Sequence, residues 1–325
     1  MALFLIGRLI QSAIALFVVS LIVFVGVYAL GNPVDVLISP DATREEVERV
    51  TRVLGLDRPM WEQYGLFLLN AVRGDLGNSF IHNQPAIRLI IERFPATFEL
   101  AICAMLMAVL LGIPLGMWAG MKPDSLSGRT IMAGSILGFS LPTFWVGLLL
   151  IMVFAVELGW LPATGRGETV HVLGVRLSVV TLDGLAHLAL PALNLALFKI
   201  ALVIRLTRAG TREVLLADYI KFARAKGLSR KRIILVHVLR NILVPIVTVL
   251  GLELGSVIAY SVVTESIFAW PGMGKLMIDA VNILDRPIIV AYLVVVVLMF
   301  TVINLAVDLL YSVIDPRVRL RPSPS

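Results

Sequence analysis

Six apolar stretches, each long enough to cross a lipid bilayer as an α-helix, constrain this chain more than any other feature. A bilayer has a hydrocarbon core of ~30 Å, which ~20 helical residues span. The predicted spans are Leu9–Leu30, Leu100–Gly120, Ile131–Val156, Leu185–Ile204, Ile242–Val263 and Ile288–Leu310. Charged residues make up only 15% of the chain, against about 25% in soluble domains. We therefore predict an all-α membrane protein with six transmembrane helices.

Three further features refine this prediction. The first span is predicted to be an uncleaved helix, because its apolar run exceeds the ~7–15 residues of a signal peptide core and no A-x-A site follows. The stretch Tyr64–Val72 is too short to span and is expected to lie at the interface or pack as a short helix. Residues Leu141–Trp145 contain a proline that breaks the third span.

The charges between the spans predict the orientation. Segments 1–8, 121–130, 205–241 and 311–325 contain 16 Lys/Arg and 4 Asp/Glu in 70 residues. Segments 31–99, 157–184 and 264–287 contain 11 Lys/Arg and 16 Asp/Glu in 121 residues. Because positive residues concentrate on cytoplasmic loops, both termini are expected in the cytoplasm, as an even number of spans requires.

The predicted cytoplasmic segment 205–241 contains a basic helix–turn–helix. Glu213–Lys226 is rich in helix-forming residues and ends at Gly227, a natural helix stop. Ser229 is placed to cap a second helix, which Arg230–Arg232 begin. The small residues near the turn allow another protein to approach closely. An amphipathic helix held by anionic lipid fits the same pattern equally well.

At this segment the sequence resembles the permeases of binding-protein-dependent ABC importers, in the dipeptide, oligopeptide and nickel branch. Residues Ala223–Leu228, Leu239–Asn241 and Pro245 look like the cytoplasmic "EAA" loop of that family. The other segments that carry the resemblance are Leu54–Pro59, Trp61–Tyr64, Arg73–Gly77, Pro95–Thr97, Glu265–Gly272, Asp308–Tyr311 and Asp315–Arg317. The chain departs from the pattern at Lys221, which stands where the family has the glutamate that names the loop.

The resemblance implies a type I ABC importer permease fold in the inner (plasma) membrane of a prokaryote. It implies ATPase-coupling residues, namely Ala223, Arg224, Ala225, Lys226 and Gly227. The implied partners are a second homologous permease in a heterodimer, two cytoplasmic ATPases, an external substrate-binding protein and membrane lipid, with no nucleic acid. The implied cargo is small peptides of the dipeptide or oligopeptide class, or a related small solute such as a nickel complex. The implied domains are 1–95, an N-terminal span with an external segment; 96–312, the permease core with coupling loop 205–241; and 313–325, a cytoplasmic tail.

The chain itself is not expected to be an enzyme. A Walker A loop needs G-x-x-x-x-G-K-[ST], and the nearest string, Gly272–Leu276, lacks both the first glycine and the hydroxyl residue. Neither H-E-x-x-H nor G-x-S-x-G occurs, and the four histidines are scattered. We therefore predict no catalytic residue, no metal site and no cofactor in this chain, with ATP and Mg bound by the partner ATPases.

Two of the ionisable residues within predicted spans are of particular interest, because charge there is costly and is a functional candidate. Glu253 lies about midway along the fifth span and Lys199 nearer the cytoplasmic end of the fourth. Our hypothesis is that Glu253 faces the translocation pathway and attracts a cationic group, with Lys199 and Asn194 as further pathway candidates. The alternatives are a Glu253–Lys199 ion pair, a snorkelling lysine, and interhelical hydrogen bonding by Asn194. Glu99, at a span end, is expected to be hydrated.

The predicted outer loop after the fifth span contains Glu265, Phe268 and Trp270, which are candidates for an outer gate or a contact with the binding protein. An aromatic anchor at the membrane interface fits the two rings equally well. Three other function classes are the alternatives: an ion-coupled secondary transporter, a lipid-modifying enzyme and a membrane scaffold. The chain shows neither an internal repeat nor clustered catalytic residues, and a scaffold leaves Lys199 and Glu253 without a role.

Overall fold

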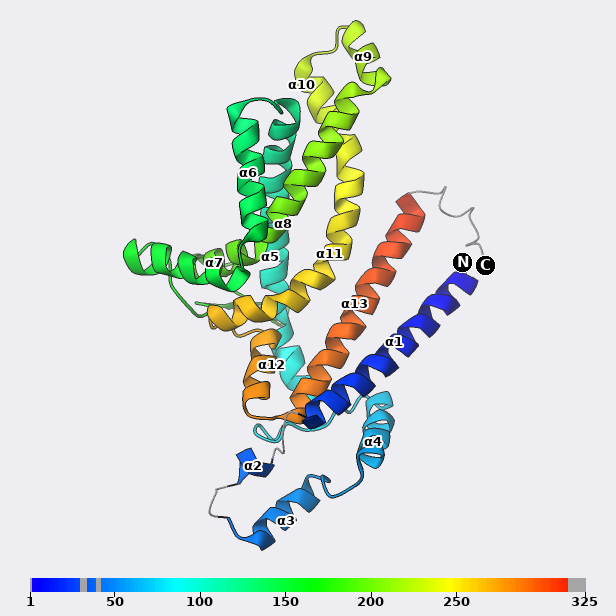
Figure 1. Ribbon diagram of the computed structural model, residues 1–325, viewed down its shortest axis with the longest axis vertical. Coiled ribbons are helices and arrows are strands. Elements are labelled where there is room, and N and C mark those ends of the chain that lie inside the picture. Colours follow the sequence, from blue (N-terminus) through cyan, green and yellow to red (C-terminus); the bar gives the residue numbers. More distant parts are fainter. Residues whose placement is uncertain (1, 30–33, 39–41, 315–325) are drawn as a thin grey trace. The chain divides into compact units, whose positions relative to one another are not determined.

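The computed structural model describes residues 2–29, 34–38 and 42–314 (Figure 1). These residues form helices and one small antiparallel hairpin. They group into two compact units, Met1–Thr97 with Pro271–Leu305 and Phe98–Trp270 with Ala306–Ser325. The first unit contains α1 (Ala2–Ala29), α2 (Val34–Leu37), α3 (Arg44–Val53), α4 (Met60–Val72), the start of α5 (Ala86–Met121), α12 (Met273–Asn282) and most of α13 (Arg286–Ile314).

The short helices of the first unit form for local reasons. Thr43 and Glu46 make a reciprocal capping box at the start of α3. Helix α4 packs on α1 through Tyr64, whose ring centroid lies 5.2 Å from that of Phe24 and whose hydroxyl lies 3.0 Å from Ser20 Oγ. Tyr64–Val72 is thus part of a short packed helix, as predicted.

Asp285 fixes the turn that precedes α5 in this unit. Its carboxylate accepts hydrogen bonds from the hydroxyl of Ser79 and, at 3.1 Å, from the backbone N–H of Phe80. Both Asp285 and Ser79 are buried, so the buried charge is stabilised by its donors.

The second unit holds most of the long helices. Its elements are the rest of α5, α6 (Leu126–Ser140), α7 (Thr143–Leu150), the π-helix η1 (Ile151–Glu157), β1 (Val170–Val172), β2 (Val175–Leu177), α8 (Leu182–Leu216), α9 (Asp218–Ala225), α10 (Arg230–Arg232), the π-helix η2 (Ile233–Val238), α11 (Leu239–Ile267) and the end of α13. The hairpin pairs Val170 with Leu177.

Helix α8 lies at the centre of this unit, in contact with α6, α7 and α11 (Figure 1). Helices α5 and α8 approach closely because small residues line their contact. A Cβ added at Gly116 of α5 would lie 2.6 Å from Thr207 Cβ and 2.7 Å from the carbonyl oxygen of Ile204. Small residues at such contacts let membrane helices pack backbone to backbone.

Four of the described helices are long and apolar enough to cross a membrane: Ala86–Met121, Leu182–Leu216, Arg230–Ile267 and Arg286–Val307. A fifth candidate is the pair Leu126–Ser140 and Thr143–Glu157, which is bent by 108°. Within α1, the apolar helix Ala13–Gly26 is shorter than the ~20 residues that a span needs. The six predicted spans therefore correspond to five candidates plus a shorter apolar helix, and six crossings stay a prediction.

The structure corrects several boundaries and details. The third predicted span is not one continuous helix, although its break at Leu141–Pro142 is confirmed. Helix α5 begins 14 residues before the predicted Leu100, inside the segment predicted to be external. The hairpin β1–β2 and helix α12 were not predicted. Residues 315–325 of the predicted tail lie outside the described residues.

Candidate functional site

Lys199 of α8 and Glu253 of α11 form an ion pair within two of the apolar helices. Ser256, one helical turn after Glu253, completes the group. The ammonium of Lys199 donates to Ser256 Oγ at 3.0 Å, and the Ser256 hydroxyl donates to Glu253 Oε2 at 2.7 Å. Ser256 was missed in the sequence, although its i+3 spacing from Glu253 places it on the same helix face.

The two partners differ in burial. The Lys199 side chain is 8% exposed, and that of Glu253 is 31% exposed. A charge at bilayer depth is costly unless it is paired, so Glu253 and Ser256 stabilise the buried ammonium. Part of the Glu253 side chain is exposed, and its role in a translocation pathway stays a prediction.

Asn194 joins the same two helices. It is 1% exposed, and its Nδ2 donates to Thr264 Oγ1 of α11 at 2.9 Å. The interhelical hydrogen bond predicted for Asn194 is thus confirmed. Its Oδ1 is buried and has no hydrogen-bond partner among the residues that the structure describes. Its part in a translocation pathway stays a prediction.

The basic turn between α9 and α10 follows the predicted geometry. Gly227 has a φ of 75°, the left-handed conformation that glycine adopts without strain. Ser229 caps α10, since its Oγ accepts a hydrogen bond from the backbone N–H of Arg232. Lys221, at the position of the family's glutamate, pairs with Asp218 at 2.8 Å.

Four of the five predicted coupling residues lie on the surface of this turn: Arg224, Ala225, Lys226 and Gly227. Ala223 differs, because it is 8% exposed and faces the chain's own interior beside the buried Ile220. Arg224 and Arg230 line a pocket of about 380 Å³ together with apolar side chains. The turn therefore presents basic groups around a partly apolar hollow.

The segment with Glu265, Phe268 and Trp270 is buried, with exposures of 0%, 1% and 0%. The backbone N–H of Gly165, in the loop between η1 and α8, donates to the Phe268 carbonyl at 2.8 Å. Ser261 Oγ donates to Glu265 Oε1 at 2.9 Å. The chain's own residues thus cover all three side chains, so neither Phe268 nor Trp270 is available as an aromatic anchor at a lipid interface. Their part in an outer gate or a binding-protein contact stays a prediction.

Glu99 was expected to be hydrated, and this was wrong. It is 6% exposed, and its carboxylate lies 2.6 Å from the guanidinium of Arg166. It also accepts hydrogen bonds from the backbone N–H groups of Ser178 and Val179 at 2.7 and 2.8 Å, and from Ser178 Oγ at 2.9 Å. Charge-assisted hydrogen bonds of this kind are about twice as strong as neutral ones. Glu99 therefore anchors the loop between η1 and α8 (residues 158–181) to α5.

Across the described ranges, no group of three or more His, Cys, Asp or Glu side chains is arranged to hold a metal ion.

The comparisons with protein families cover nearly the whole chain. Residues 112–320 match the family described as "Binding-protein-dependent transport system inner membrane component". Residues 1–101 match the corresponding N-terminal family of membrane components.

Curated proteins of similar length match the chain from end to end. The dipeptide transport system permease protein DppB of Escherichia coli (strain K12) is 38% identical over 322 residues, which cover 93% of this chain and 94% of the relative. The glutathione transport system permease protein GsiC of the same strain is 39% identical over 323 residues, covering 98% and 99%. The di/tripeptide permease DppB of Pseudomonas aeruginosa is 38% identical over 306 residues, covering 89% and 90%.

A solved structure supports the fold. A chain of the MetNI methionine ABC transporter, in an inward-facing conformation, matches with a TM-score of 0.52 at 16% identity. The match covers 70% of this chain and 97% of that one. The helical architecture of a type I ABC importer permease is thus common to both.

Proposed function

This chain belongs to the family of inner membrane components of binding-protein-dependent transport systems, and we propose that, as such a permease subunit, it carries small peptides across the membrane. The observation that supports this cargo is the 38–39% identity, over nearly the full length, to permeases named for dipeptides and for glutathione, a small peptide. A related small solute, such as a nickel complex, is the second candidate. Transport by this family is driven by ATPase partners, so an ion-coupled secondary transporter is disfavoured.

The proposed assembly has a second homologous permease, two cytoplasmic ATPases that bind ATP and Mg, and an external binding protein. In it this chain crosses the membrane six times with both termini in the cytoplasm. The chain supplies no catalytic residue. The basic turn after α9 docks on an ATPase through Arg224, Ala225, Lys226 and Gly227, while Ala223 fixes the turn from beneath. ATP-driven closure of the ATPases then switches the permease between two packed states.

We propose that Glu253 recognises the positive charge of the cargo. Its partly exposed side chain attracts the ammonium of a peptide amino terminus, and the carboxylate pairs with Lys199 when no cargo is present. Asn194 orients α8 against α11 at the same site. Uptake with Glu253→Gln tests this role: peptides with a free amino terminus should lose transport, while N-acetylated peptides should be unaffected. Equal uptake of both by the variant and the parent would remove the role.

The cargo is tested by uptake of a radiolabelled dipeptide and tripeptide into cells that lack their own peptide importers. The cells express this permease together with the ATPases and the binding protein of the proposed assembly. We expect that uptake stops when ATP is depleted and that unlabelled peptide lowers the uptake of labelled peptide by competition. Uptake abolished by an uncoupler at normal ATP would contradict the ATP-driven mechanism, and competition by a nickel chelate alone would favour the second cargo.

The coupling contact is tested by cross-linking from Arg224→Cys or Ala225→Cys in a Cys103→Ser background. We expect a cross-link to an ATPase that depends on nucleotide. Phe222→Cys, exposed on the same helix but outside the proposed contact, is the matched control. Equal cross-linking from all three positions, or none in the assembled complex, would contradict the contact.

A further inference from the structure

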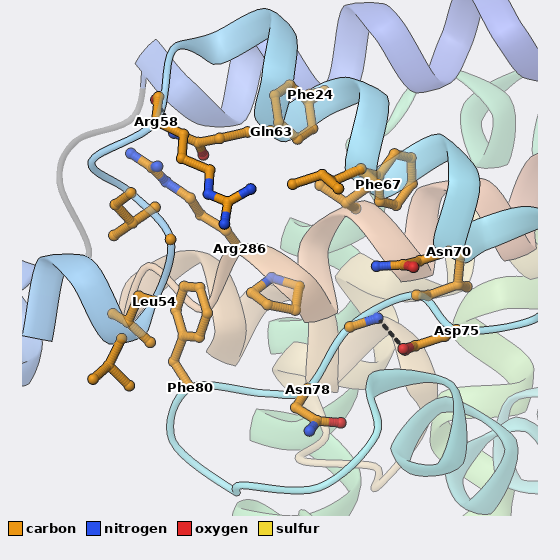
Figure 2. Close-up of a pocket in the computed structure, with 18 of the residues that line it drawn as sticks. Phe24, Leu54, Arg58, Gln63, Phe67, Asn70, Asp75, Asn78, Phe80 and Arg286 are labelled. Atoms are coloured by element: carbon orange, nitrogen blue, oxygen red, sulfur yellow. Dashed lines mark hydrogen bonds between the residues drawn. The ribbon is translucent and has the colours of Figure 1, made fainter.

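A pocket of about 440 Å³ lies in the first unit, outside every site considered so far (Figure 2). We call it the α1–α4 pocket. Its wall includes Phe24 of α1, Arg58 just before α4, Phe67 of α4, and Arg286 and Val290 of α13. Nothing in the proposed transport mechanism uses these residues.

The wall has two chemically different parts. Figure 2 shows the side chains of Arg58 and Arg286 passing each other on one side of the pocket, while Phe24 and Phe67 lie together at another part of the wall. The two rings have centroids 6.0 Å apart. Guanidinium groups bind phosphate and carboxylate through paired N–H donors, and the rings offer an apolar surface. A ligand that suits both parts is an amphiphile with an anionic head.

The charges that line the pocket favour an anion. Three arginines line it, Arg52, Arg58 and Arg286, against one carboxylate, Asp75, which accepts the backbone N–H of Gly77 at 2.9 Å. Arg58 pairs with Glu62 at 3.3 Å, but both side chains are about half exposed. Exposed ion pairs contribute little, so Arg58 remains able to bind a second oxyanion.

The neighbouring surface of α1 is suited to lipid. Ile14 and Ile22, on the apolar stretch that leads to Phe24, are 57% and 64% exposed. Exposed apolar side chains on a helix of this kind mark a surface that another apolar phase covers, which for an inner membrane permease is the bilayer. The pocket lies where this apolar helix meets the segment of α3 and α4, so a lipid that covers α1 can reach it.

We infer that the α1–α4 pocket binds one anionic phospholipid. Its phosphate contacts Arg58 and Arg286, and the first part of an acyl chain lies against Phe24 and Phe67. This site is independent of the peptide cargo, so its failure and that of the proposed function are distinguishable.

The test is native mass spectrometry of the full-length chain, purified in detergent and titrated with dioleoylphosphatidylglycerol or dioleoylphosphatidylcholine. We expect one tightly bound phosphatidylglycerol, and weaker, non-saturating association of phosphatidylcholine. Loss of one charged hydrogen-bonding group should weaken the anionic lipid about tenfold, so Arg58→Gln and Arg286→Gln should each have this effect. Arg49→Gln, an exposed arginine of α3 outside the pocket wall, is the matched control and should bind like the parent.

Two further arms separate a lipid from a simple anion. Phe67→Ala should weaken phosphatidylglycerol binding, and millimolar inorganic phosphate should not displace the lipid. Displacement by phosphate, equal affinity for the two lipids, or equal loss in Arg49→Gln would each overturn the proposal. Arg58 lies on an exposed turn, so Arg58→Gln carries the test even where Arg286→Gln lowers the yield of folded protein.

Discussion

Glu99 holds the loop between η1 and α8 through its ion pair and its hydrogen bonds. Among the described residues, Arg166 forms an ion pair with Glu99 and with no other acid. The Arg166 side chain is only 12% exposed. Removing one partner of a buried pair leaves an uncompensated charge, which costs about 3–5 kcal/mol. We therefore expect Glu99→Ala to lower the free energy of unfolding by that amount, measured by denaturant titration in detergent.

The same variant should release the loop locally. Limited proteolysis should cut Glu99→Ala within residues 158–181 faster than the parent, because the backbone N–H groups of Ser178 and Val179 lose their acceptor. Glu157→Gln, at the exposed end of η1, is the control and should behave like the parent. Parent-like stability and cleavage of Glu99→Ala would mean that the loop is held by other contacts.

Because Lys199 and Glu253 are paired, substitutions of the two residues should have non-additive effects on the free energy of unfolding. Glu253→Leu alone leaves the ammonium of Lys199 buried without its carboxylate, whereas the double variant Lys199→Met/Glu253→Leu removes both charges together. Groups in direct contact show interaction energies of about 0.5–3 kcal/mol in double-mutant cycles. We expect the double variant to be more stable than Glu253→Leu, by unfolding titration. Additive effects would mean that the two side chains do not interact in the folded protein.

Among the helices, the contact between α5 and α8 depends on glycine. At Gly116 a methyl group would meet both a side chain and the backbone carbonyl of Ile204, which cannot move cheaply. Overpacking of this kind costs about 1–3 kcal/mol, so Gly116→Ala should lower the unfolding free energy by that amount.

Gly134 of α6 provides the matched control for this contact. A Cβ there meets nothing within 4 Å, and replacing glycine by alanine inside a helix gains about 0.5–1 kcal/mol. Gly134→Ala should therefore be neutral or stabilising in the same titration. A Gly116→Ala variant as stable as Gly134→Ala would show that α5 and α8 do not approach so closely.

The long helices could be predicted from the chain, whereas several shorter features could not. Runs of about 20 apolar residues have few folded alternatives in a membrane, so α8, α11 and α13 were located to within a few turns. The strands of β1–β2 have three residues each, too short for a period-2 pattern to stand out. The start of α5 carries charges such as Arg88 and Glu92, whose i,i+4 pair supports a helix only once it has formed.

In the candidate site, too, one feature could be predicted from the sequence and another could not. The ion pair of Lys199 and Glu253 was foreseeable because bilayer depth penalises either charge alone. The burial of Glu99 was not, because its partners Arg166 and Ser178 lie 67 and 79 residues away in the sequence. Contacts over such separations depend on how the loop folds back, which no local pattern of residues encodes.

For the whole molecule, the charge asymmetry of the loops makes a prediction about orientation. The loops assigned to the cytoplasm contain 16 basic and 4 acidic residues, against 11 and 16 in the others. The hairpin tip at Leu173, which is 101% exposed, should face outward, and Phe222 of α9, which is 69% exposed, should face the cytoplasm. Leu173→Cys and Phe222→Cys, each in a Cys103→Ser background that removes the single native cysteine, report the two sides.

A membrane-impermeant maleimide added to intact cells should label Leu173→Cys and not Phe222→Cys, and permeabilised cells should show both. The reason is that the proposed docking of the basic turn after α9 on a cytoplasmic ATPase puts this turn inside, and the hairpin belongs to the opposite set of loops. Labelling of Phe222→Cys alone would mean that the chain has the opposite orientation, with the turn outside the cell, where no cytoplasmic ATPase can bind it. Labelling of both positions in intact cells would require an even number of crossings between β2 and α9, which means that α8 does not span the membrane.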